Sequence, residues 1–311
     1  MTDRPSSFRA GLQAALRHRR LAGVLWLGLV VSTLPSWFAF GPLLEPLDAG
    51  PLREEVLAGW DSWAFLSFLG LKARETGVAF AAVACGLVFG VLVDLLLVAG
   101  AIRVLIADLP RPALRRTVVE GASLFGPVVR AFARYLLSLA LRLGLFVALP
   151  VALLFRAAGD APPNGPLAAL GAAWAVAGSL FVVAFANLRF SLARIALARG
   201  EASTARRAWR AAGKVLRGAR LHAAALWLSW AALGLALQAI FTAIGVRMNP
   251  GSAAGIAALV VVRQVGFWLL AMTRIGFQAS LLAFADTRRP APPLPLAHPV
   301  APPSKEALAT A

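Results

Sequence analysis

Long apolar stretches, separated by short connections, dominate this chain. At least five of them reach the roughly 20 apolar residues that a helix needs to cross about 30 Å of hydrocarbon. Only 14% of the residues are charged and 59% are hydrophobic, whereas soluble domains carry about a quarter charged residues. Inside a bilayer every backbone polar group must find a partner within the protein, and helices satisfy this. The sequence therefore predicts an all-α, polytopic membrane protein.

We expect one domain of six transmembrane helices over residues 21–285. The predicted spans are 21–43, 77–107, 135–155, 167–197, 221–246 and 253–285. Residues 1–20 place apolar positions at helical spacing among arginines, which predicts an amphipathic helix on the cytoplasmic leaflet. Further surface helices are expected at 118–132 on the cytoplasmic side and at 56–71 on the outer side. The proline- and alanine-rich residues 286–311 predict a disordered cytoplasmic tail.

The distribution of basic residues predicts the orientation. Of 31 Lys and Arg, 20 lie in the N-terminal segment, in two connections on the same side and in the C-terminal tail, and 5 lie in the remaining connections. The positive-inside rule then places both termini in the cytoplasm of a bacterial inner membrane. The first apolar run resembles a signal peptide but lacks a small-x-small cleavage site, so we expect an uncleaved first helix.

The densest basic charge lies between the fourth and fifth spans, in residues 187–220. Gly200 should end one helix, and a new helix should start near Ser203. On a helical wheel its apolar and basic residues fall on opposite faces. The basic residues could simply set topology, or they could bind anionic head groups, which attract each nearby Lys or Arg by roughly 1 kcal/mol. The candidates for head-group contact are Arg206, Arg207, Arg210, Lys214, Arg217 and Arg220.

An internal repeat is indicated by arginines with a common spacing. Arg103, Arg189 and Arg274 each lie late in an inward-running span, at intervals of 86 and 85 residues. This predicts three tandem units, each with a cytoplasmic surface helix, an outward span, an external turn and an inward span. The alternative is coincidence, because arginines favour helix ends where they can reach the interface.

Four ionisable residues inside predicted spans are candidates for a polar site: Asp94, Arg142, Arg263 and Arg274. An ionised side chain in lipid costs several kcal/mol unless it has a partner or a water-filled cavity. Asp94 and Arg142 lie at similar depth, so we expect them to form an ion pair, with Arg263 or Arg274 as rival partners. Such a pair could be a proton or anion site, or it could fix helix register.

Other chemistry finds little support in the sequence. The single cysteine excludes a disulfide framework, and three scattered histidines do not form a metal cluster. Phosphate-binding loops and catalytic triads are not evident. The net charge of +17 follows the topology and does not indicate nucleic-acid binding. We therefore expect no cofactor and no enzymatic activity.

Residues 189–210 resemble a signature of one bacterial family. The pattern is an arginine, Ser-Leu-Ala, several apolar residues, Gly-Glu and then Ala-x-x-Ala-Trp-Arg. It resembles the six-helix membrane domain that precedes the catalytic barrel in some glycerophosphodiester phosphodiesterases, and related stand-alone membrane proteins. The matching positions are Arg189, Ser191, Leu192, Ala193, Gly200, Glu201, Ala205, Ala208, Trp209 and Arg210. The resemblance implies the membrane architecture alone, because a segment long enough for the barrel is absent.

Two functional hypotheses follow. The first is a non-enzymatic inner-membrane protein that organises or senses the bilayer, or scaffolds partners, through its basic helices, with anionic lipids as partners. The second is a transporter of an ion, lipid or small molecule that uses the Asp94 and arginine site. An open polar cavity lined by those residues would favour transport, and a packed apolar centre would favour the first hypothesis.

Overall fold

The computed structural model describes residues 6–32, 73–109, 114–158, 165–248 and 253–288, and these are helical apart from short connections. The helices are α1 (Ser7–Arg17), α5 (Ala73–Ile106), α6 (Leu114–Leu143), the π-helical turn η1 (Gly144–Ala148), α7 (Leu149–Ala158), α8 (Pro166–Ala198), α9 (Ala205–Leu216), α10 (Arg220–Arg247) and α11 (Ala253–Asp286). Residues 19–32 are also helical. The all-α prediction is confirmed for this part of the chain.

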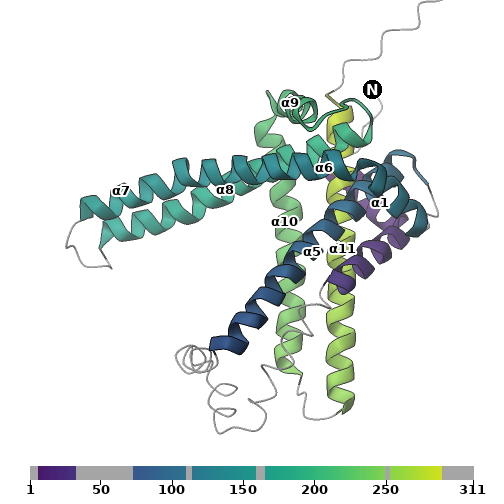
Figure 1. Ribbon diagram of the computed structural model, residues 1–311, viewed down its shortest axis with the longest axis horizontal. Helices are drawn as coiled ribbons and strands as arrows, with labels where there is room; N and C mark the ends of the chain where they lie inside the picture. Colours follow the sequence, from purple (N-terminus) through teal and green to yellow (C-terminus); the bar gives the residue numbers. More distant parts are fainter. Residues whose placement is uncertain (1–5, 33–72, 110–113, 159–164, 249–252, 289–311) are drawn as a thin grey trace, which may run out of the picture.

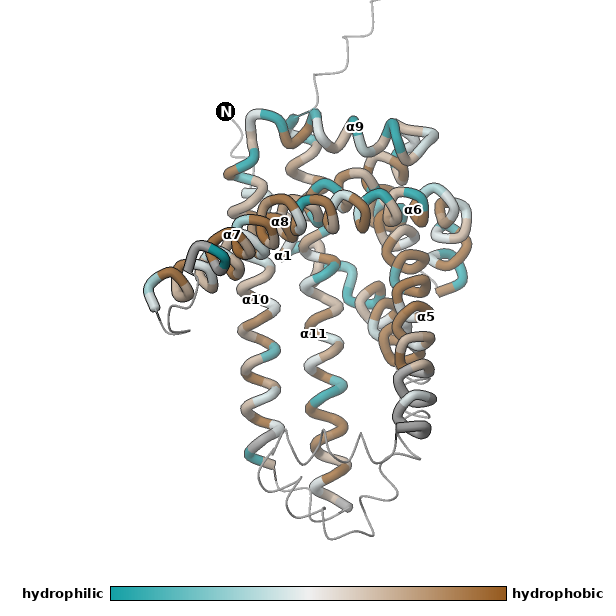
Figure 2. Tube along the Cα trace, turned by 60° about the vertical axis from the view of Figure 1, so that its left-hand side comes forward, coloured by the Kyte–Doolittle hydropathy of each residue, from teal (hydrophilic) through white to brown (hydrophobic). Residues whose placement is uncertain are grey.

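Five helical stretches are long and apolar enough to cross a membrane: Val83–Ile106, Leu114–Leu154, Pro166–Ala198, Arg220–Gly245 and Ala254–Asp286. Hydrophobic residues run along most of their length (Figure 2). The chain is therefore a multi-pass membrane protein. The predicted first span is helical over residues 21–32, and its remainder, the outer helix at 56–71 and the tail after residue 288 lie outside the described residues.

The third predicted span differs from the structure. We expected a surface helix at 118–132 and a separate span at 135–155, but α6, η1 and α7 form one continuous helix. The residues between the two predicted elements contain no helix-ending residue, and Pro127 is accommodated inside α6. A stripe of buried residues at helical spacing, from Thr117 to Ala131, continues on both sides of this proline. Packing of that stripe against α5 outweighs the local tendency of proline to end the helix.

The helices meet at one end of the molecule, which we call the head. It comprises α1, α9, residues 19–32, the N-terminal halves of α6 and α10, and the C-terminal halves of α5, α8 and α11, and the buried hydrophobic residues concentrate there. From the head, α10 and α11 run downward in Figure 1, whereas η1, α7 and the first half of α8 extend sideways as an arm. The outer halves of these helices leave large apolar side chains exposed.

Three contacts in the head join a helix to the end of a long one. Helix α1 lies on α11, α6 on α5, and α9 on α8. Small residues permit each close approach. A Cβ on Gly11 would collide with Ser280 of α11, and a Cβ on Gly100 of α5 would collide with the carbonyl of Thr117. The buried face of α9 consists of Ala205, Ala208, Ala212 and Leu216.

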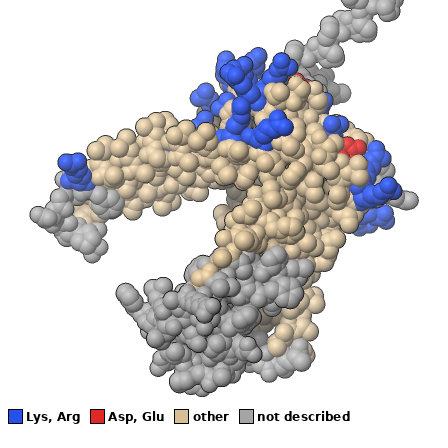
Figure 3. All heavy atoms as spheres, viewed as in Figure 1, with Lys and Arg blue, Asp and Glu red and all other residues tan. Residues whose placement is uncertain are grey.

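Basic residues gather on the head. In Figure 3 the Lys and Arg side chains cover its upper surface around α9 and its right-hand end, and the visible arm is almost free of charge until its tip. Helix α8 ends at Ala198, and Gly200 follows with φ of +74°, a conformation that favours glycine. Thr204 then caps α9 by accepting a hydrogen bond from the Arg207 backbone N–H at 3.3 Å. The turn presents the basic face of α9 outward.

Candidate functional site: charged clusters in the head

Asp94 of α5 forms an ion pair with Arg274 of α11. The distance from Arg274 Nη1 to Asp94 Oδ1 is 2.5 Å. The side chains retain 39% and 47% exposure, respectively. The pair therefore connects two spans while keeping one side open.

Arg194 of α8 lies beside this pair and is almost completely buried, at 7% exposure. Its Nη2 donates a hydrogen bond to Ser191 Oγ at 3.2 Å, and its guanidinium lies 4.5 Å from the centre of the Phe190 ring. Ser191 Oγ in turn donates to Asn187 Oδ1 at 3.2 Å. The Arg194 Nε is buried and has no hydrogen-bond partner among the described residues. A buried donor without a partner is costly, so it marks a place where a polar group could bind.

These side chains line a common cavity of about 200 Å³. Its polar lining consists of Asp94, Asn187, Arg194, Arg274 and Gln278. Two guanidinium groups face one carboxylate, so the described lining carries one excess positive charge. Such a cavity can hold water or a small anion.

The expected pairing of Asp94 with Arg142 was wrong, and Arg274, one of the two rival partners, is the residue that pairs with Asp94. Arg142, although at a similar depth along its helix, lines a different cavity, and Arg274 is the partner that the structure places against Asp94. The buried stripe of α6 runs from Thr117 to Ala131, and Arg142 lies about three turns beyond it, whereas Arg274 lies where α11 meets α5. Arg263 is exposed on α11 and lines none of the four cavities found among the described residues. The four predicted residues thus do not form one site.

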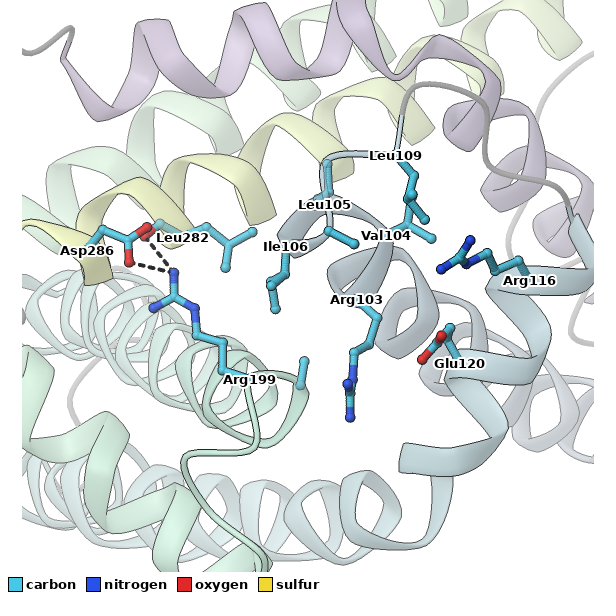
Figure 4. A pocket seen from close by; sticks show the side chains of 12 residues that line it. Arg103, Val104, Leu105, Ile106, Leu109, Arg116, Glu120, Arg199, Leu282 and Asp286 are labelled. Atoms are coloured by element: carbon cyan, nitrogen blue, oxygen red, sulfur yellow. Dashed lines mark hydrogen bonds and ion pairs between the residues drawn. The ribbon is translucent and has the colours of Figure 1, made fainter. Parts of the chain in front are cut away.

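A second cavity, of about 580 Å³, opens at the surface of the head (Figure 4). Its charged lining residues are Arg103, Arg116, Glu120, Arg199 and Asp286. Arg199 Nη2 lies 2.8 Å from Asp286 Oδ1, which ties the end of α8 to the end of α11. Arg103 Nε is buried without a hydrogen-bond partner among the described residues. Three arginines and two acids leave one excess positive charge in the described lining, and the pairing of Arg199 with Asp286 uses one charge of each sign.

The third cavity is the largest of those described, at about 730 Å³, and it lies where the arm leaves the head. It is lined by Arg142, Arg189, Arg217 and Arg220 at one end. Apolar and aromatic residues of η1 and α8 form the rest of its wall. The described lining contains no acid.

Arg189 joins this cavity to α9. Its Nε donates to the Trp209 carbonyl at 3.3 Å, and its guanidinium lies 4.8 Å from the centre of the Trp209 ring. A Cβ on Gly213 would lie only 3.2 Å from Arg189 Nη2, so glycine provides the room for the guanidinium. The three arginines of the proposed repeat, Arg103, Arg189 and Arg274, each line a different cavity.

The predicted head-group residues lie on one exposed surface. Arg206, Arg207, Arg210 and Lys214 are exposed on α9, and Arg217 and Arg220 are exposed in and after the connection to α10. None of the described ion pairs involves these residues. The apolar face of α9 packs on the protein, so its basic face is the one that remains free.

Both described histidines contact neighbouring side chains in the head. His18 is buried, and its Nε2 lies 3.5 Å from Asp108 Oδ1, while Arg17 Nη2 lies 3.1 Å from Asp108 Oδ2. His222 stacks on Phe284 with a ring separation of 5.7 Å. Among the described residues there is no group of three His, Cys, Asp or Glu that could hold a metal ion.

Comparison with protein families, curated proteins and solved structures finds no match to this chain. The resemblance to the membrane domain of glycerophosphodiester phosphodiesterases thus stays a prediction.

Sequence reasoning missed Arg194 and the aromatic wall of the largest cavity. Arg194 could have been noticed because it interrupts the apolar run Leu192–Leu197 within a predicted span. The wall is formed by residues of α8 and η1, and no sequence signal distinguishes these aromatic residues from ordinary lipid-facing ones.

Proposed function

We propose that this chain is a non-enzymatic protein of the bacterial inner membrane that organises the bilayer by binding anionic lipids at its basic cytoplasmic surface. The observation that carries the proposal is the exposed face of α9, where four cations have no acidic partner among the described residues. In this proposal the head faces the cytoplasm, and both termini lie in the cytoplasm. Anionic lipids of the cytoplasmic leaflet are the natural counter-charge for such a surface.

The electrostatic attraction expected between this surface and anionic lipids is large enough to support a lasting interaction. At roughly 1 kcal/mol for each Lys or Arg near an anionic surface, the six residues from Arg206 to Arg220 contribute up to about 6 kcal/mol. Screening reduces this contribution beyond a Debye length of about 8 Å. The six residues lie in α9, in the connection after it and at the first position of α10, so they act on a small group of lipids.

The test is the composition of lipids that co-purify with the protein in native-lipid discs. The protein should enrich phosphatidylglycerol over phosphatidylethanolamine relative to the bulk membrane. Replacing Arg206, Arg207, Arg210 and Lys214 with glutamine should remove most of this enrichment. The matched control replaces Arg130 and Arg134, which are exposed on α6, with glutamine. Equal lipid composition for the wild type and the α9 variant would refute the proposal.

We also propose that the domain consists of three units that close into a ring. In this scheme each surface helix packs on the inward span of another unit: α6 on α5, α9 on α8, and α1 on α11. Small buried residues recur at the proposed spacing, at Gly100, Ala186 and Ala271. The closing contact from α1 to α11 supports the scheme, because these helices lie at opposite ends of the described chain. Disulfide crosslinking of paired cysteines across each of the three contacts tests it.

Transport of a small anion is the alternative function, and one observation favours it. The cavity beside Asp94 and Arg274 also receives the buried Arg194, whose Nε has no partner among the described residues. Flux of chloride or phosphate into liposomes, lost on replacement of Arg194 with methionine, would support transport. Absence of any flux from the wild type would leave the lipid-organising function as the better account.

A further inference from the structure

The largest cavity has two chemically distinct ends. The four arginines at one end come from four places in the fold: Arg142 from α6, Arg189 from α8, Arg217 from the connection after α9 and Arg220 from the start of α10. The described residues that line it include no acid, and none of the described ion pairs involves these four arginines. Four guanidinium groups around one cavity repel one another. An anion that enters this end would relieve the repulsion.

The other end is apolar and follows α8 outward. Phe185, Phe181 and Trp174 of α8, with Phe146 of η1, form its wall. From Phe185 to Trp174 the helix advances about 16 Å at 1.5 Å per residue. This distance is about the length of one acyl chain, since the chains of one leaflet fill about half of a 30 Å hydrocarbon core. The wall is therefore long enough to accompany one acyl chain.

A local irregularity of the backbone holds this wall in place. In a regular α-helix the Phe146 carbonyl would accept a hydrogen bond from residue 150, but Pro150 has no N–H. The chain forms the π-helical turn η1 at this point, and Trp174 Nε1 donates to the Phe146 carbonyl at 2.9 Å. Gly178 lets η1 approach α8, since a Cβ there would lie 3.2 Å from Val147 Cγ2. Turns of the π type often occur at functional sites.

We propose that this cavity binds one anionic phospholipid, with its phosphate among Arg142, Arg189, Arg217 and Arg220 and one acyl chain along the aromatic wall. The volume of about 730 Å³ lies within the range of ordinary ligand pockets. A free phosphate would leave the aromatic wall without a role, and a neutral lipid would leave the arginines uncompensated. The inference rests on the proposed function and deepens it by assigning one specific lipid site, which shares Arg217 and Arg220 with the exposed basic surface.

Native mass spectrometry of the detergent-purified full chain tests the site. Delipidated protein is mixed with phosphatidylglycerol, phosphatidylcholine, sn-glycerol 3-phosphate or inorganic phosphate. We expect one phosphatidylglycerol to bind, at least about tenfold more tightly than phosphatidylcholine. The two probes without acyl chains should bind far more weakly than the lipid. Equal binding of the two lipids would overturn the proposal, and tight binding of phosphate alone would replace the lipid by a free anion.

Variants separate this site from the basic surface. Arg142→Gln should weaken the single phosphatidylglycerol by about tenfold to a hundredfold, as expected for loss of a charge-assisted hydrogen bond. Phe181→Ala should weaken the lipid while leaving the weak binding of sn-glycerol 3-phosphate unchanged, which keeps the test valid if an arginine variant is unstable. The matched control is Arg263→Gln, another arginine within a span, which lines none of the described cavities. Unchanged lipid affinity in both cavity variants would refute the site.

The outcomes for the two proposals are distinguishable. Glutamine at Arg206, Arg207 and Arg210 of α9 should reduce the general enrichment of anionic lipid in native-lipid discs and leave one tightly bound phosphatidylglycerol per chain. If the enrichment persists in the α9 variant while the cavity variants lose the single lipid, the proposed surface function fails and the cavity site stands. If the enrichment is lost but no single lipid is retained by the wild type, the cavity site fails alone.

Discussion

Removing the charge of Asp94 should destabilise the protein through one identified partner. The carboxylate accepts a hydrogen bond from Arg274 Nη1 at 2.5 Å. A hydrogen bond to a charged group contributes about 1.5–3 kcal/mol, and an exposed ion pair contributes about 0–1 kcal/mol. With 39% and 47% of the two side chains exposed, we expect a coupling between these limits, about 1–2 kcal/mol. This coupling stabilises the folded state, because the negative charge of Asp94 offsets the positive charges of Arg194 and Arg274.

The assay is a double-mutant cycle on the free energy of unfolding in mixed micelles. The variants are Asp94→Asn, Arg274→Gln and their combination, measured by loss of helicity or by thermal unfolding. The double variant should be more stable than the sum of the two single losses predicts, by the coupling energy. The control cycle pairs Asp94→Asn with Arg142→Gln, whose effects should add within about 0.5 kcal/mol because the residues line different cavities.

The two cycles distinguish the structure from the expectation based on span depth. Additive losses for Asp94 and Arg274, together with coupling of about 1 kcal/mol or more between Asp94 and Arg142, would refute the assignment of the partner. Coupling in neither cycle would show that the ion pair contributes nothing to stability.

Three further predictions concern packing and buried polar groups. Gly11→Ala should lower the free energy of unfolding by about 1–3 kcal/mol, because the added Cβ would overlap α11. The control Gly23→Ala should leave this free energy unchanged, because its Cβ would meet no atom within 4 Å. Equal effects of the two variants on thermal unfolding would contradict the packing of α1 on α11. Trp174→Phe should cost about 1–2 kcal/mol, since the Phe146 carbonyl would lose the indole donor; an unchanged midpoint of thermal unfolding would rule out this role. Arg194→Met should leave the free energy of unfolding unchanged or raise it, because it removes an incompletely paired buried cation. A loss above about 2 kcal/mol in the same assay would show that Arg194 is fully paired.

The helical class was predictable because the apolar segments satisfy one strong physical constraint, the pairing of backbone groups in lipid. Helices α5, α8, α10 and α11 lie where long apolar segments were expected. The end of α8 could also be predicted from the sequence, since Gly200 adopts the left-handed conformation that glycine tolerates. Such features depend on local sequence and on length.

The site was less predictable because it depends on how the helices cross. Similar depth in the bilayer did not identify the partner of Asp94, because depth does not tell which spans are neighbours. The sequence around Pro127 did not tell whether the helix would end, because the answer lies in the packing of α6 on α5. The sequence shows Arg194 within an apolar run, but only the fold places it beside Asp94 and Arg274.

The most direct measurement of the central proposal is the lipid selectivity of the reconstituted protein. Spin-labelled phosphatidylglycerol and phosphatidylcholine report how much of each lipid is motionally restricted at the protein surface. For the wild type we predict a preference for phosphatidylglycerol that falls as NaCl is raised from about 0.1 M to 1 M, where the Debye length shrinks from about 10 Å to 3 Å. The preference should be largely absent when Arg206, Arg207, Arg210 and Lys214 are replaced with glutamine. Equal restriction of both lipids, or a preference that neither salt nor these substitutions alter, would contradict it.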